Sequence, residues 1–234
     1  MGRVAADRAP RLGWRPIWRE GAEVALCAVV LALFVRTFLF QAFHVPSDSM
    51  APTLRAGDQV LVNKFVFRGG WPLPAREPRP YDLALFRLAS DPDELLVKRC
   101  VAVEGERVEL VDKQLRIDGH AIREPWAVHG DDRTYPRSRF VPRELRARDN
   151  FGPRTVPPGH LFFLGDNRDY SRDSRSFGAV PRSAILGRPV LVFWSRAGDD
   201  HPLRGPTLAR SRLGRLRAVL FGAGDTGRGI RLAR

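Results

Sequence analysis

The chain has 234 residues, of which 44% are hydrophobic, and it carries a formal net charge of +13. This length is enough for one sizeable domain with appendages, and the ordinary hydrophobic content excludes a protein built from many membrane spans. Most of the charge lies in the tails, because residues 1–20 carry +3 and residues 203–234 carry +7, which leaves about +3 for everything between. The central region has no basic and aromatic face, so we expect no nucleic-acid partner. Basic tails beside a membrane segment favour anionic phospholipids instead.

A run of apolar residues follows the basic N-terminus. Val24–Val35 contains no charged side chain, and with its apolar extension the segment over residues 22–43 is about as long as the hydrocarbon core of a bilayer is thick. Trp14 and Trp18 precede the run, where aromatic residues are typical of a membrane interface. We therefore predict a single transmembrane anchor at 22–43, with residues 1–21 in the cytoplasm and the main domain outside the membrane. A cleavable signal peptide is the alternative, although no small-x-small site follows the run.

Most of the remaining chain has the pattern of short β-strands separated by turns. We predict strands at residues 58–66, 83–87, 95–104, 107–111, 114–117, 161–164 and 185–194, with a hairpin turn at Asp112-Lys113. The expected fold class is mostly β, in which the N-terminal transmembrane helix is followed by a β-rich domain over residues 44–202. Residues 124–159 are polar and rich in Pro and Arg, and we interpret them as a long surface insertion that is partly ordered at best. For the basic tail over residues 203–234, a short amphipathic helix on the membrane and a disordered segment are both open.

Two polar features of this domain point to chemistry. Residues 44–54 form a serine-rich turn, HVPSDSMAPTL, directly after the apolar segment. Lys98 stands in the apolar run Leu95-Leu96-Val97-Lys98, in a chain where Arg is abundant and Lys is scarce. A serine hydroxyl needs a neighbouring base to become a nucleophile, and a lysine can accept its proton only when apolar surroundings lower the lysine pKa. The pattern favours a Ser/Lys pair, although spacing alone also suits a lysine that points into solvent.

A third polar block, GDNRDYSRDSRSFG, covers residues 165–178 and follows an apolar strand directly. Within it Asp173 and Arg175 can pair and hold a structured loop, and Ser171 and Ser174 can hydrogen-bond to a nearby amine. The cysteines, Cys27 and Cys100, lie in the predicted anchor and in a predicted strand, so we expect no disulfide. We find no Cys or His spacing typical of a metal site and expect no cofactor.

In this order, the three blocks resemble those of the type I signal peptidases, the membrane-bound Ser/Lys proteases that remove signal peptides. VPSDSMAPTLRAGDQVLVNKF resembles the serine block of that family, VKRCVAVEGERV its Lys-Arg block and GDNRDYSRDSRSFG its Gly-Asp-Asn-Arg-Asp block. The resemblance covers about residues 22–196. One departure is Arg79-Pro80-Tyr81-Asp82, which keeps only the first and last residues of the family's Arg-Gly-Asp block.

The resemblance implies a role for each matching residue. Ser49 corresponds to the nucleophile and Lys98 to the general base, while Ser47 and the Ser49 backbone N–H correspond to the oxyanion hole. Ser171 matches the serine that orients the lysine, and Asp173 and Arg175 match a supporting ion pair. The positions that match the family's shallow substrate pockets are Phe43, Val45, Met50, Leu54, Val60, Leu96 and Val97. The resemblance therefore implies a hydrolase of the inner membrane whose partners are secretory preproteins, cut after Ala-x-Ala type sites.

Two other functions are consistent with parts of this pattern. One is a self-cleaving regulator of the repressor type, which uses the same dyad chemistry but has a DNA-binding domain and no membrane segment. The other is a membrane-tethered β-domain that binds partners and has lost its activity, and the joint presence of Ser49, Lys98 and Ser171 argues against it.

Overall fold

The computed structural model describes residues 15–68, 75–88 and 90–195, and the basic tail over 203–234 lies outside these ranges. The chain divides into two compact units, Met1–Leu39 and Phe40–Arg234. The described part of the first unit is helical, with α1 over Arg15–Phe34 followed by a π-helical turn, η1, over Val35–Leu39. The apolar side chains of α1 are exposed, among them Val24 at 69% and Leu26 at 64%. None of the described helices has the length and sustained apolarity of a membrane-crossing segment.

The helical segment ends earlier than the sequence indicated. Residues Phe40–His44 form strand β1, which pairs antiparallel with strand β2 over Gln59–Asn63. The predicted boundary of the anchor at residue 43 is therefore wrong. The apolar residues misled the prediction because Phe40 and Phe43 are three positions apart, a spacing that fits one face of a helix, whereas in strand β1 they point to opposite faces.

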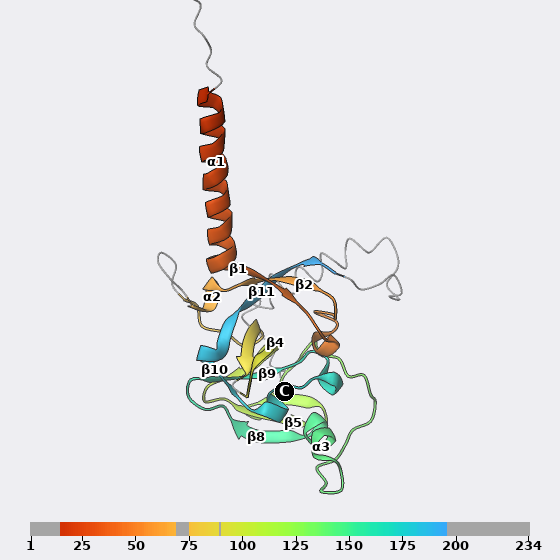
Figure 1. Cartoon of the computed structure of the whole chain (residues 1–234). Coiled ribbons are helices and arrows are strands. Elements are labelled where there is room, and N and C mark those ends of the chain that lie inside the picture. Colours follow the sequence, from red (N-terminus) through yellow and green to blue (C-terminus); the bar gives the residue numbers. More distant parts are fainter. Residues whose placement is uncertain (1–14, 69–74, 89, 196–234) are drawn as a thin grey trace, which may run out of the picture. The chain divides into compact units, whose positions relative to one another are not determined.

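The second unit is mostly β, as predicted, and holds two antiparallel sheets among its described residues (Figure 1). The larger sheet has the strand order β1-β2-β11-β3-β4-β9-β10. Its further strands are β3 (Leu83–Leu88), β4 (Asp91–Val103), β9 (His160–Leu164), β10 (Val180–Pro181) and β11 (Ile185–Trp194). The last long strand thus lies between β2 and β3, and it joins the two halves of the sheet.

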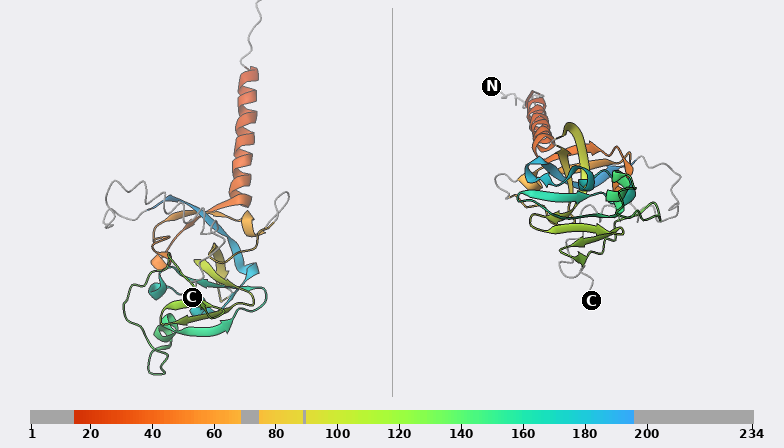
Figure 2. Two further views of the ribbon diagram at one scale, coloured as in Figure 1. Left: turned by 180° about the vertical axis from the view of Figure 1, so that it is seen from behind. Right: turned by 90° about the horizontal axis from the view of Figure 1, so that it is seen from below.

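The smaller sheet has the order β7-β6-β5-β8. Its strands are β5 (Arg107–Val111), β6 (Gln114–Ile117), β7 (His120–Ala121) and β8 (Phe151–Thr155). In all three views this sheet lies away from β1 and β2, at the other end of the unit (Figures 1 and 2). The predicted hairpin is confirmed: Asp112 and Lys113 both have positive φ, at 49° and 70°, as a two-residue hairpin turn requires.

The region over residues 124–159 is more structured than predicted. It contains helix α3 over Arg143–Asp149 and strand β8, and Phe151 and Val156 are buried in the core beside the smaller sheet. The strand was not recognised because its sequence, FGPRT, contains Gly and Pro, which are uncommon in strands. Gly152 is needed here, because its φ is +77° and a Cβ atom on it would lie 2.4 Å from the Val108 carbonyl oxygen.

The remaining short helices flank the sheets. They are η2 (Asp48–Met50), α2 (Phe65–Arg68), η3 (Arg168–Tyr170), α4 (Ser174–Phe177) and η4 (Arg182–Ala184). Three buried apolar clusters fill the unit. The cluster around Val45, Met50 and Leu54 packs β2, β3 and β4 together. It therefore fixes the serine-rich turn against the strand that carries Lys98.

Candidate active site

Ser49 is presented by the short helix η2, in the connection between β1 and β2. Ser47 precedes this helix in an extended conformation and is exposed, whereas Ser49 is 9% exposed. The third polar block holds η2 from the other side. The backbone N–H of Asn167 donates to the Ser49 carbonyl oxygen at 3.1 Å, and the Asn167 side-chain amide donates to the Asp48 carbonyl oxygen at 3.1 Å. These bonds fix the orientation of the serine backbone.

Lys98 lies on β4 with its ammonium nitrogen next to this serine. The Lys98 Nζ and the Ser49 Oγ are 2.6 Å apart, and the Ser47 Oγ lies 3.2 Å from the Ser49 Oγ. Only 2% of Lys98 is exposed. Burial lowers the lysine pKa from 10.5 to about 8, although the nearby carboxylates of Asp173 and Asp166 oppose part of this change. The structure therefore brings a readily deprotonated amine within hydrogen-bond reach of a hydroxyl.

The predicted pair of Asp173 and Arg175 is present behind this site. The Arg175 Nη2 lies 2.7 Å from the Asp173 Oδ2, and the same arginine donates to the carbonyl oxygens of Arg148 and Arg168. Asp173 also accepts from the Gly165 N–H at 3.1 Å. Burial by itself would raise the pKa of Asp173, but Arg175 and the backbone donors hold that pKa below its usual value. The aspartate is therefore a fixed negative charge at neutral pH.

Ser171 lies close to these groups, but its side chain forms no hydrogen bond with Lys98. Its Oγ is buried and has no hydrogen-bond partner among the described residues. A Cβ atom on Gly165 would lie 2.1 Å from the Ser171 Oγ and 2.5 Å from the Ser49 carbonyl oxygen. The absence of a side chain at Gly165 is what lets the serine-bearing turn and the Ser171 loop approach one another.

A buried polar network beside the dyad was not predicted. The Arg99 guanidinium forms two hydrogen bonds with Asp166, at 2.8 and 2.6 Å, and the Thr53 Oγ1 donates to the same carboxylate at 2.6 Å. The Arg99 guanidinium also lies 4.6 Å from the ring of Trp126. The sequence signal for this network was a charged residue, Arg99, inside the longest buried strand, because such a residue requires a partner.

Most of the predicted pocket residues gather in one apolar cluster below Ser49. Phe43 packs against this cluster. The five predicted pocket residues that are buried in the cluster are Val45, Met50, Leu54, Val60 and Val97. Leu96 instead packs against a different cluster, which centres on Phe86 and Phe163. In residues 15–68, 75–88 and 90–195, no three His, Cys, Asp or Glu side chains are grouped as metal ligands.

The comparison with known proteins identifies the family. Residues 18–194 match the sequence model of the family described as signal peptidase, peptidase S26. The chain belongs to the S26 signal peptidase family. The S26 chain is therefore a serine peptidase, and its family membership implies signal-peptide processing.

Curated relatives of this S26 peptidase span most of its length. Signal peptidase I of Mycobacterium tuberculosis is 31% identical over 237 residues, which cover 82% of this chain and 78% of that protein. Signal peptidase I V of Bacillus subtilis is 34% identical over 161 residues, covering 68% and 89%. A crystal structure of a signal peptidase I from Enterococcus faecalis matches with a TM-score of 0.38 and 29% identity, covering 48% of this chain and 97% of the other.

Proposed function

We propose that this chain is a membrane-bound endopeptidase that removes signal peptides from exported preproteins, with Ser49 as nucleophile and neutral Lys98 as general base. One observation carries the assignment: the Nζ of a lysine that is 2% exposed lies 2.6 Å from the Ser49 Oγ. A lysine in water is protonated at neutral pH and cannot accept a proton. Burial lowers the pKa of Lys98, so that the neutral amine is populated near neutral pH and can act as the base that a serine nucleophile requires.

In the proposed reaction, Lys98 takes the proton of the Ser49 hydroxyl while the Ser49 Oγ attacks the scissile carbonyl carbon. The negative charge that develops on the carbonyl oxygen is stabilised by the Ser49 backbone N–H and the Ser47 hydroxyl, each worth roughly 3 kcal/mol. Lys98 then gives its proton to the leaving amine, and the mature protein departs. Lys98 then takes a proton from a water molecule that attacks the acyl carbon. The bond to the Ser49 Oγ breaks, this oxygen takes the proton back from Lys98, and the signal peptide leaves with a new carboxylate after losing its acid proton to solvent.

Ser171 is proposed to orient the amine of Lys98. Two features support this role: its Oγ is buried without a partner, and Gly165 allows it to approach the serine-bearing turn. The pair of Asp173 and Arg175 is proposed to hold the loop that carries Ser171, because Arg175 bonds to the start of this loop at Arg168 and also joins it to α3 at Arg148. A buried hydroxyl without a hydrogen bond is unfavourable, so a small rotation toward the amine would stabilise both groups.

The preference for small side chains is proposed to come from the apolar cluster. Leu54 and Val60 have no exposed surface, so they form the floor of the proposed pocket and support the residues that contact substrate. A shallow apolar floor accepts Ala and excludes larger side chains by overlap. Cleavage after Ala-x-Ala sites follows from this arrangement.

The N-terminal segment is proposed to anchor the enzyme in the inner membrane, with the N-terminus cytoplasmic and the β-rich unit extracytoplasmic. The exposed apolar side chains along α1 support this proposal, as do the arginines that precede the apolar run. Anionic phospholipids are the proposed partners of the basic tails. Resistance to alkaline carbonate extraction, together with protease digestion of the β-rich unit only from the outer face, would test the anchor and its orientation.

The catalytic assignment is tested by incubating a purified preprotein with wild type and variants in detergent. We expect Ser49→Ala and Lys98→Arg to abolish cleavage with the circular dichroism spectrum unchanged, because guanidinium does not accept a proton near neutral pH. Lys64→Arg is the matched control and should cleave normally. Full activity of Lys98→Arg would refute the assignment of the base. Cleavage of the enzyme itself without cleavage of any preprotein would instead favour the self-cleaving regulator.

A further inference from the structure

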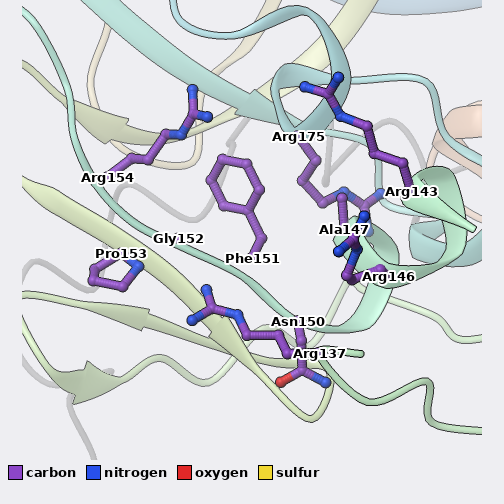
Figure 3. Close-up of a pocket in the computed structure, with 10 residues that line it drawn as sticks. All are labelled: Arg137, Arg143, Arg146, Ala147, Asn150, Phe151, Gly152, Pro153, Arg154 and Arg175. Carbon is purple, nitrogen blue, oxygen red and sulfur yellow. The ribbon is translucent and has the colours of Figure 1, made fainter. Parts of the chain in front are cut away.

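A basic pocket lies between α3 and β8, in the part of the chain that was expected to be a surface insertion. Its volume is about 400 Å³, within the range of small-ligand sites. It is lined by Arg137, Arg143, Arg146, Ala147, Asn150, Phe151, Gly152, Pro153, Arg154 and Arg175. In Figure 3 the Phe151 ring lies in the middle, with Arg154 on one side, Arg137 below it, and Arg143 and Arg146 on the other side.

All charged side chains that line this pocket are positive. Five of the ten lining residues are arginines and none is acidic. Arg175 is already paired with Asp173, but the other four arginines form no ion pair among the described residues. Like charges gathered within a Debye length of about 8 Å repel one another. A counter-charge inside the pocket would relieve that repulsion.

Local structure explains why these side chains converge. Arg143 and Arg146 are three residues apart on α3, and Ala147 and Asn150 continue the same helical face. Arg154 comes from β8 on the other side, where its guanidinium lies 5.6 Å from the Phe151 ring centre. Arg137 lies in the chain before α3. The pocket therefore receives guanidinium groups from three separate backbone segments.

The directions of approach favour a phosphate over a carboxylate. A carboxylate is planar and presents two oxygens, so one or two guanidinium groups satisfy it. A phosphoryl group presents three acceptor oxygens with a charge of about −1.5 to −2, and it can meet guanidinium groups from several sides at once. Arginine is also the side chain that binds phosphate in a bidentate manner.

We propose that this pocket is a binding site for a phosphate-class anion, separate from the residues of the proposed dyad. Its ligands are the guanidinium groups of Arg137, Arg143, Arg146 and Arg154, and the Phe151 ring forms its floor. The anion is either free in solution or the phosphomonoester headgroup of a phospholipid such as phosphatidic acid. Arg175 is shared between the wall of this pocket and the ion pair behind the active site, so the two sites are neighbours in the fold.

The proposal is tested by calorimetric titration of the full-length protein, in phosphatidylcholine nanodiscs, with pyrophosphate at fixed ionic strength. We expect a Kd below about 1 mM for wild type and affinities about tenfold weaker for Arg146→Gln and for Arg154→Gln, because each removes a charge-assisted hydrogen bond. Arg139→Gln is the matched control. It removes the same charge from an exposed arginine that stacks on Phe140 outside the pocket, and it should bind like wild type. If either pocket variant fails to fold, Arg137→Gln replaces it, since Arg137 is exposed and lies outside the helix and the strand.

A second arm distinguishes the two sources of phosphate. Nanodiscs containing phosphatidic acid, whose headgroup is a phosphomonoester, should weaken pyrophosphate binding to wild type if the headgroup occupies the pocket, and should leave it unchanged if the natural ligand is a free phosphate. Both results support the site. The absence of millimolar binding, or equal binding by wild type and Arg146→Gln, would overturn it. So would a glutamate-rich peptide that binds as tightly as pyrophosphate with the same dependence on Arg146, because the site would then be one for acidic peptides.

Discussion

The lowered pKa of Lys98 predicts a specific pH dependence of cleavage. With the pKa at about 8, about half of the enzyme carries a neutral lysine at pH 8 and only about 1% does at pH 6. The rate constant kcat/KM should therefore rise about fiftyfold between these two pH values and level off above pH 9. A lysine with its ordinary pKa of 10.5 would be only about 0.3% neutral at pH 8, and kcat/KM would still rise tenfold per pH unit at pH 9.

The assay is cleavage of a short peptide with an Ala-x-Ala site, measured at substrate concentrations well below KM from pH 6 to pH 10. Asp173 does not titrate in this window, because its pKa is held below its usual value. The circular dichroism spectrum, recorded at each pH, excludes unfolding as the cause of a change. A rate that does not change between pH 6 and pH 9 would show that the lysine is not the base, and a rate that still rises tenfold per unit at pH 9 would show that burial does not lower its pKa.

Three further predictions concern stability and packing. Between pH 8 and pH 10.5 the unfolded chain binds the Lys98 proton while the folded chain does not, so the unfolding free energy of wild type relative to that of Lys98→Met should rise with pH by about 3 kcal/mol across this window. The comparison cancels the opposite effect of Cys100, because burial raises the pKa of that thiol in both proteins. A difference in unfolding free energy that does not change with pH in urea titrations of the two proteins would contradict the prediction. Gly165→Ala should abolish precursor cleavage and cost about 1–3 kcal/mol in urea unfolding, because its Cβ would overlap the Ser171 Oγ and the Ser49 carbonyl oxygen; wild-type activity would rule out the close approach. Thr53→Val should lower the unfolding free energy by about 1–3 kcal/mol, because it removes one of the two donors to the buried Asp166 Oδ2, the other being Arg99; a urea midpoint equal to that of wild type would show that the bond contributes nothing.

The strands that alternate between apolar and polar residues, or that form short apolar runs between turns, were predictable. The bounds of β5 and β6 agree with the prediction, and β2, β3, β4, β9 and β11 all lie where strands were expected. Alternation is a reliable signal because successive side chains of a strand point to opposite faces. The turn at Asp112-Lys113 was predictable for a related reason, since a two-residue loop between two apolar runs leaves few other conformations.

The elements that were missed have competing signals. Phe40–His44 continues an apolar run, so its pairing with β2 is decided by tertiary contacts and not by its composition. The strand over Phe151–Thr155 contains Gly152, whose positive φ and close approach to β5 both require the absence of a Cβ atom. Strand pairing that depends on residues far apart in the chain cannot be predicted from the local sequence.

The two proposed reactive residues of the candidate site were predictable from the sequence, but the buried hydrogen-bond network beside them was not. Ser49 and Lys98 could be named from their unusual settings and from the family resemblance, and the structure places their side chains within hydrogen-bond distance. The bonds from Thr53 and Arg99 to Asp166 join residues that are 113 and 67 positions apart in the chain. No spacing rule connects such residues, so this network is visible only in the folded protein.

The order of strands in the larger sheet also makes the proposed dyad depend on a strand that supplies none of its groups. Ser49 precedes β2 and Lys98 lies on β4, but the strand hydrogen-bonded between β2 and β3 is β11, over Ile185–Trp194. The sheet therefore joins the half next to Ser49 to the half that carries Lys98 only through β11. In the proposed mechanism, β11 must be in place before the serine and the lysine are held in register, although it takes no part in the reaction itself.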